Sequence, residues 1–319
     1  MAELEYADVE AAAGRIAGRV RPVVLSRYDT SEGVLADREV WLALEFLQHT
    51  GSFKARGAQN FIQAHLAAGT LPEGVTIASG GNAGMACAWA ARQAGVPATV
   101  FLPETAPGFK VDRLRGYGAD VRLEGSEYAA ALAACAEFAK TTGALQSHAY
   151  AHPLIAAGAG TLVDEIRGGL PHVDTVAVAV GGGGLFAGVA TAAQHHGIRT
   201  VAVEPENCRA LNAALEAGSL VDVPVDSVAA DSLGARRTWQ GALEAGQHPL
   251  VESVLVTDDE LIAARQQLWD ERRIVVEHGT AAALAALLTS AAGRGYRPGA
   301  GESVVVVLCG ANTDPSDLV

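Results

Sequence analysis

The feature that most constrains the fold is a repeated order of apolar segment, glycine-containing turn and helical segment. It occurs in residues 74–95 and 173–197, and other apolar segments cover residues 96–104, 199–206 and 302–309. These segments lack the alternation of apolar and polar residues expected of a strand with one solvent-exposed face, so each predicts a buried strand. Buried strands that alternate with helices predict an α/β fold with open, mostly parallel sheets flanked by helices.

Composition excludes several classes of partner. Half of the 319 residues are hydrophobic and the net charge is −13, which argues against binding to nucleic acid or to an anionic membrane, because both require a positive surface. The four cysteines form no CxxC pair and have no zinc-site spacing, so we expect a reducing, cytoplasmic setting. No apolar run reaches membrane-spanning length, and the acidic first residues do not resemble a signal peptide.

Four consecutive glycines, Gly181 to Gly184, follow the apolar segment that ends at Val180 and precede a helical segment that begins near Leu185. Without side chains, their backbone N–H groups can converge on an anion at the start of a helix, so this turn predicts a phosphate site. The alternative is that the glycines only allow close packing of strand and helix. A dinucleotide-binding fingerprint fits poorly, because residues 186 and 187 are not glycine.

Two further segments are candidates for function. The turn from Ser79 to Gly84 also lies between an apolar segment and a helix, and its amides could hold a carboxylate, although an ordinary turn is equally compatible. Lys54 follows Gly51 and Phe53 at the start of a helical segment. A positive charge there opposes the helix dipole, which favours a functional lysine over a solvent-exposed one.

Together these motifs resemble those of the fold-type II pyridoxal phosphate enzymes, and within them the serine and threonine dehydratase and serine racemase group. The motifs are Lys54, the turn that begins at Ser79, the four glycines, and the segment Leu308-Cys309-Gly310-Ala311-Asn312, in the order typical of the family. The resemblance implies an α/β, tryptophan synthase β-like fold of two domains. The large, cofactor-binding domain would comprise residues 1–73 and 151–319, and the small domain residues 74–150.

The resemblance also implies a role for each matched residue. Lys54 corresponds to the catalytic lysine that carries pyridoxal 5′-phosphate, and Asn82 corresponds to the partner of the cofactor 3′-hydroxyl. The implied cofactor contacts are Phe53, Lys54, Asn82, Gly181, Gly182, Gly183, Gly184, Leu185, Glu277 and Cys309. The implied contacts with the substrate are Ser79, Gly80, Gly81 and Ala83.

The activity implied by the resemblance is β-elimination from a small hydroxy amino acid such as L-threonine or L-serine, which gives a 2-oxo acid and ammonia. Which amino acid is used stays open. The alternatives are β-replacement, as in cysteine synthases, a threonine-synthase-like reaction, and a non-catalytic protein that binds the cofactor or an amino acid. The resemblance further implies a homodimer that acts on a small amino-acid substrate.

Three positions depart from the family pattern. Gly80 stands where racemases have a serine, and a glycine cannot donate a proton, so we do not expect racemisation as the main activity. Ala83 replaces a histidine, which changes the wall of the substrate pocket. Glu204 matches one ligand of the family's divalent-cation site, but Ala210 stands where an aspartate is expected and only the nearby Glu206 could replace it, so a metal at Glu204 is possible but is not predicted.

Overall fold

The structure is a computed structural model that describes residues 4–29, 33–36, 38–72, 74–289 and 293–318. The strands are β1 (Leu25–Arg27), β2 (Glu39–Ala43), β3 (Val75–Ala78), β4 (Ala98–Leu102), β5 (Asp120–Leu123), β6 (Leu145–Gln146), β7 (Thr175–Ala179), β8 (Arg199–Pro205), β9 (Val251–Val256) and β10 (Ser303–Val307).

The α-helices are α1 (Tyr6–Ile16), α2 (Lys54–Ala67), α3 (Asn82–Ala94), α4 (Gly108–Gly116), α5 (Tyr128–Thr142), α6 (Pro153–Gly169), α7 (Gly184–His195), α8 (Ala210–Ala217), α9 (Ala230–Leu233), α10 (Gln240–Gly246), α11 (Asp258–Arg272) and α12 (His278–Leu288). Two short 3-10 helices, η1 (Glu45–Leu47) and η2 (His49–Gly51), lie between β2 and α2.

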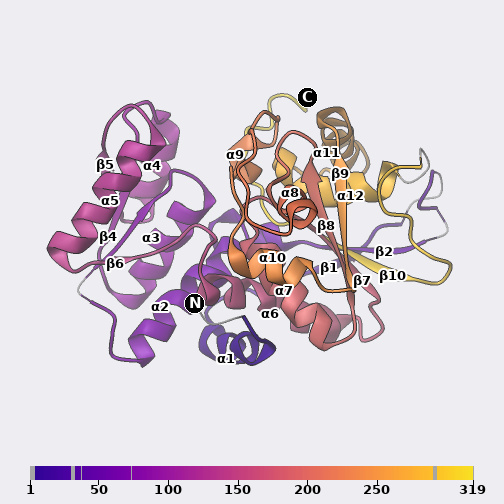
Figure 1. Cartoon of the computed structure of the whole chain (residues 1–319), viewed down its shortest axis with the longest axis horizontal. Coiled ribbons are helices and arrows are strands. Elements are labelled where there is room, and N and C mark those ends of the chain that lie inside the picture. Colours follow the sequence, from indigo (N-terminus) through magenta and orange to yellow (C-terminus); the bar gives the residue numbers. More distant parts are fainter. Residues whose placement is uncertain (1–3, 30–32, 37, 73, 290–292, 319) are drawn as a thin grey trace.

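The described strands form two sheets that lie in two lobes (Figure 1). The larger sheet has six strands in the order β1-β2-β10-β7-β8-β9, and only its edge strand β1 is antiparallel to its neighbour. Helices α7 and α12 both pack against β7 and β8. We call this sheet with α6 to α12 the large lobe.

The smaller sheet has four parallel strands in the order β5-β4-β3-β6. Its faces follow the two-residue period of a strand: Val100 and Leu102 of β4 join the core with α2, α3 and α4, whereas Phe101 packs with α5. We call this sheet with α3, α4 and α5 the small lobe, which spans residues 75–146.

The α/β fold with mostly parallel sheets flanked by helices is therefore as predicted. Both β3 and β7 lead into a glycine turn and then a helix, as the sequence pattern indicated. The borders of the two domains stay a prediction. None of the helices in the described ranges has the length and apolar character that a bilayer crossing requires.

Candidate active site

Lys54 is the first residue of α2, and the residues before it are paired with the segment that follows β10. The Phe53 N–H donates to the Cys309 carbonyl over 2.9 Å, and the Ala311 N–H donates to the Gly51 carbonyl over 3.0 Å. Residues far apart in the sequence are thereby fixed side by side. The pairing brings the predicted catalytic lysine to the predicted contact Cys309.

The Lys54 side chain is only partly exposed, and its amine points into the protein. Its Nζ donates to the Ala149 carbonyl over 2.7 Å and lies 4.9 Å from the centre of the Phe53 ring. Burial lowers the pKa of Lys54 to about 8, and the charge of the nearby Glu277 acts in the opposite direction. An amine with this pKa is partly neutral near pH 7 and can act as a nucleophile or a base.

The tetraglycine turn connects β7 to α7 and is covered by Tyr150. A Cβ on Gly182 would lie 2.3 Å from Cγ of the Tyr150 ring, so no side chain fits there, and Gly183 has φ +89°, which favours glycine. Among the described residues, no protein acceptor binds the N–H groups of Gly181 to Leu185. These amides at a helix N-terminus are suited to an anion such as phosphate.

The turn after β3 forms a second site of the same kind at the start of α3. Within the described chain, the N–H groups of Gly80 to Ala83 also donate to no protein acceptor. A Cβ on Gly80 would lie 2.7 Å from Cδ2 of the buried Leu102, so a serine at this position would force Leu102 to move. The turn therefore offers backbone amides, with no hydroxyl at position 80.

Asn82, Glu277 and Asn312 form a hydrogen-bonded network next to this turn. The Asn82 amide Nδ2 donates to both oxygens of Glu277, over 2.9 and 3.1 Å, and the Asn312 N–H donates to Glu277 Oε1 over 2.9 Å. The Asn312 Nδ2 donates to Asn82 Oδ1 over 2.6 Å. Burial raises the pKa of Glu277, and its bonds with the two asparagines oppose that increase.

Cys309 is buried beside Thr280, whose Oγ1 lies 3.3 Å from the Cys309 Sγ. Burial raises the pKa of the Cys309 thiol to about 12, so it is neutral at pH 7. A neutral thiol is a weak hydrogen-bonding group and supplies no negative charge to its neighbours.

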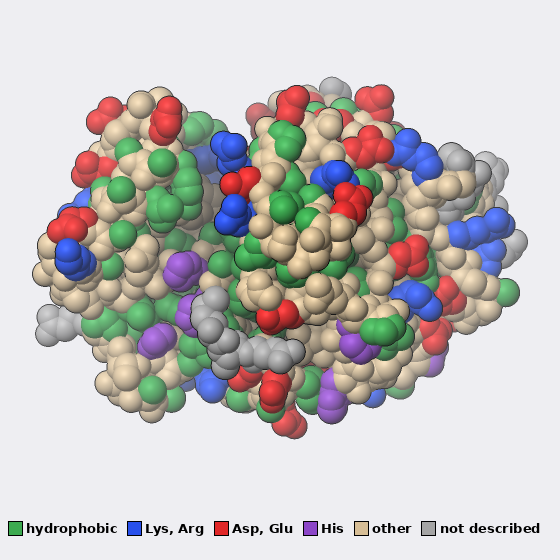
Figure 2. All heavy atoms as spheres, in the orientation of Figure 1, with side chains coloured by type: hydrophobic (Ala, Val, Ile, Leu, Met, Phe, Trp, Pro, Cys, Tyr) green, Lys and Arg blue, Asp and Glu red, His purple; other side chains and the backbone are tan. Residues whose placement is uncertain are grey.

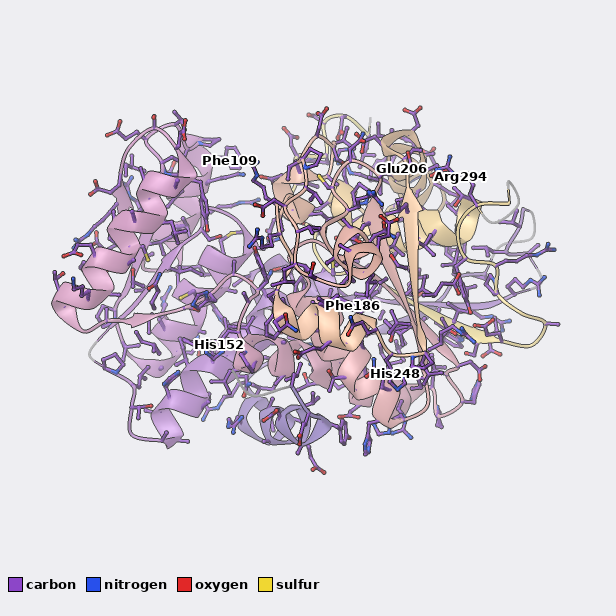
Figure 3. All side chains as sticks on the ribbon, in the orientation of Figure 1. Phe109, His152, Phe186, Glu206, His248 and Arg294 are labelled. Carbon is purple, nitrogen blue, oxygen red and sulfur yellow. The ribbon has the colours of Figure 1, made fainter. Side chains whose placement is uncertain are left out.

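A small cavity of about 20 Å³ lies between the turn after β3 and the large lobe. It is lined by Gly80, Gly81, Asn82, Met85, Phe109, Lys110, Arg113, Asp231, Glu277 and Asn312. Figure 2 shows basic and acidic side chains gathered in the gap between the lobes, and Figure 3 labels Phe109 on the side of the small lobe that faces this gap. The cavity joins the predicted substrate turn to the predicted cofactor contacts Asn82 and Glu277.

Residues 20–310 match the family described as "Pyridoxal-phosphate dependent enzyme". The chain belongs to this family.

Several members of the family are similar over nearly the whole chain. A human protein named "Serine dehydratase-like" is 40% identical over 286 residues, which cover 87% of this chain and 86% of the relative. An "L-threonine ammonia-lyase" of Geobacter sulfurreducens is 35% identical over 316 residues, covering 98% of this chain and 76% of that protein.

Among solved structures, a serine racemase from maize superposes with a TM-score of 0.90 at 28% sequence identity and covers 99% of this chain and 96% of its own. The fold is therefore that of the fold-type II pyridoxal phosphate enzymes, and the protein is a pyridoxal phosphate-dependent enzyme.

The residues present fit pyridoxal phosphate. The unpartnered amides from Gly181 to Leu185 suit its phosphate. The Lys54 amine lies on the same side of the protein as these amides. It donates to the Ala149 carbonyl, and the next residue, Tyr150, covers Gly182. The Leu185 side chain packs into the core of the large lobe, so only its backbone can contact a ligand.

The family's divalent-cation site does not fit the residues in this chain. Both oxygens of the buried Glu204 accept N–H groups at the start of α8, from Leu211 over 2.8 Å and from Asn212 over 2.7 Å. Ala210 has no ligand atom, and Glu206 is paired with Arg294 over 2.5 Å. The described residues contain no group of three or more His, Cys, Asp or Glu that could hold a metal ion.

Several residues of this site have no signal of their own in the sequence. Ala149 and Tyr150 lie in a segment without a glycine motif, and Lys110 and Asp231 lie on surface helices whose pattern indicates only exposure. Asn312 ends the motif that contains Cys309, but the motif predicts no role for it. Its position directly after Cys309, Gly310 and Ala311 is the one signal in the sequence that indicates a place in the site.

Proposed function

We propose that the protein catalyses β-elimination from a small hydroxy amino acid such as L-serine or L-threonine, producing a 2-oxo acid and ammonia. The observation that carries this proposal is the inward-pointing Lys54 amine, with a pKa of about 8, near two groups of unpartnered backbone amides. The names of the serine dehydratase-like and threonine ammonia-lyase relatives support the same reaction.

We place pyridoxal phosphate with its phosphate at the amides of Gly181 to Leu185 and its ring near Phe53, Asn82, Glu277 and Cys309. Pyridoxal phosphate held there would be carried by Lys54 at rest, and once the amino group of the substrate had taken the place of Lys54, it would withdraw electrons from the α-carbon, which would make the α-proton acidic and favour departure of the β-hydroxyl.

The amides of Gly80 to Ala83, next to Ser79, would hold the substrate carboxylate at the N-terminus of α3, where a negative charge is stabilised by the helix. With the carboxylate fixed, the amine of Lys54 in its neutral form removes the α-proton as a general base. The Ala149 carbonyl, 2.7 Å from Nζ, keeps this amine turned into the site.

Two residues favour elimination over competing reactions. Cys309 remains a neutral thiol at pH 7, so it cannot hold a ring nitrogen in its protonated form as an aspartate would. Less charge is then stored on the cofactor, and departure of the hydroxyl is favoured over transamination. Gly80 provides no hydroxyl at the position where racemases of the family have a serine, which argues against racemisation.

The test is to supply the purified, cofactor-loaded protein with L-serine and L-threonine, without any added nucleophile, and to measure 2-oxo acid and ammonia. We expect both products in equal amounts, and we expect Lys54→Ala to abolish them while Lys140→Ala, an exposed lysine of α5, does not. Product that forms only when a thiol or another nucleophile is added would favour β-replacement, and full turnover by Lys54→Ala would refute the mechanism.

We also propose that the protein works as a cytoplasmic homodimer. The resemblance to the family supports the dimer, and light scattering of the purified protein tests it. The location is supported by the four cysteines, which are all buried and unpaired, as is usual in a reducing compartment.

A further inference from the structure

One ion pair connects the two lobes at the cavity next to the substrate turn. Lys110 Nζ on α4 lies 2.5 Å from Asp231 Oδ1 on α9. Within the described ranges, no other ion pair joins residues 75–146 to the rest of the chain. Among the described residues, the only other hydrogen bond from a charged side chain of α4 to a residue outside the small lobe is a long one, 3.4 Å from Arg113 to Asn312 Oδ1.

The stem of Lys110 lies against the turn that we assign to the substrate carboxylate. A Cβ built on Gly80 would lie 4.0 Å from Lys110 Cδ, and both residues line the cavity. The Lys110 side chain is 25% exposed, whereas Asp231 is 69% exposed. Lys110 therefore connects the two lobes: its aliphatic chain lies next to the turn, and its ammonium pairs with Asp231 at the rim of the large lobe.

The cavity measures about 20 Å³, which is room for about one water molecule. An amino acid is larger than this, so side chains that line the cavity, Lys110 and Asp231 among them, must move to admit one, and the ion pair can form again once it is bound. An ion pair between partly exposed groups contributes little free energy, so it can break and form again in every turnover. Closure of this kind orders the site around a substrate and limits the access of water.

We propose that Lys110 and Asp231 are positioning residues that hold the small lobe closed over the substrate. This inference rests on the proposed function, because the turn that Lys110 covers is where we place the substrate carboxylate. Neither residue takes part in the chemistry. Their pairing sets the fraction of protein in which Gly80 to Ala83 face the Lys54 amine at the distance required for reaction.

The experiment compares Lys110→Met, Asp231→Asn and the double variant, each loaded with cofactor. We expect each single variant to lower kcat/KM for L-serine about fivefold, the upper range for an exposed pair, and the double variant to be no worse than either. Lys110→Arg should restore most of the activity. The control is Arg115→Met, because Arg115 lies on the same helix and its pair with Asp112 stays within α4.

A second measurement does not depend on turnover. Hydrogen exchange of the backbone amides in residues 80–83 and 103–110 should become faster in both single variants and in the double variant, to the same extent. Unchanged exchange in the single variants, or losses of kcat/KM that add in the double variant, would overturn the inference. If wild-type protein gives no 2-oxo acid from any hydroxy amino acid, the proposed function fails, and the exchange data still decide the role of the pair.

Discussion

The lowered pKa of Lys54 makes a quantitative prediction about cofactor attachment. A free lysine has a pKa of 10.5, and burial lowers that of Lys54 to about 8. Only the neutral amine attacks the aldehyde of pyridoxal phosphate. Because the pKa is lowered by about 2.5 pH units, the neutral fraction at pH 7 is about 300 times larger than that of an ordinary lysine.

The assay mixes protein stripped of cofactor with pyridoxal phosphate and follows the absorbance of the attached form by stopped flow. Between about pH 6 and pH 8 the rate should rise about tenfold per pH unit, and above about pH 8 it should level off. Nα-acetyl-lysine, which has a free side-chain amine, is measured in the same buffers to correct for titration of the cofactor itself. A rate that keeps rising tenfold per unit up to about pH 10 would mean that Lys54 is an ordinary lysine.

Glu277 offers a further check of this reasoning, because its charge raises the pKa of Lys54. Glu277→Gln should therefore move the levelling point of the attachment rate to a lower pH. A shift to a higher pH would show that Glu277 acts on Lys54 by some means other than its charge.

Three other substitutions test the surroundings of the site. Gly182→Ala places its Cβ 2.3 Å from an atom of the Tyr150 ring, so cofactor affinity, measured by fluorescence titration, should fall at least about tenfold, while Gly168→Ala, which meets nothing within 4 Å, should leave it unchanged. Glu204→Gln replaces one of the two oxygens that accept the N–H groups of Leu211 and Asn212 and should lower the free energy of unfolding in urea by about 1–3 kcal/mol. EDTA should not change turnover of the wild-type protein, and inhibition that magnesium reverses would contradict the absence of a cation site. Arg56→Met removes the only charged partner that the buried Glu45 has among the described residues, at 2.5 Å, and should lower the free energy of unfolding by about 3–5 kcal/mol in the same assay.

The parts of the molecule that the sequence predicted well are those in which one short segment carries the whole signal. β7, the tetraglycine and α7 follow one another in residues 175–195, and the turn from Ser79 to Gly84 is equally local. In each, an apolar run and a helix fix the direction of the chain, and glycines mark the turn between them. The positions of Asn82 and Cys309 follow, because each is adjacent to such a turn or strand end.

Contacts that depend on packing between lobes left no such signal, and they decide how the site closes. Tyr150 covers Gly182 because the chain crosses from β6 to α6 at that point, and no motif marks the crossing. Asp231 lies on α9, a helix of four residues with too few positions to show a period. The local motifs therefore predict which groups bind the cofactor. The pairing of Lys110 with Asp231, which we propose holds the small lobe closed over the substrate, arises only when the two lobes pack side by side.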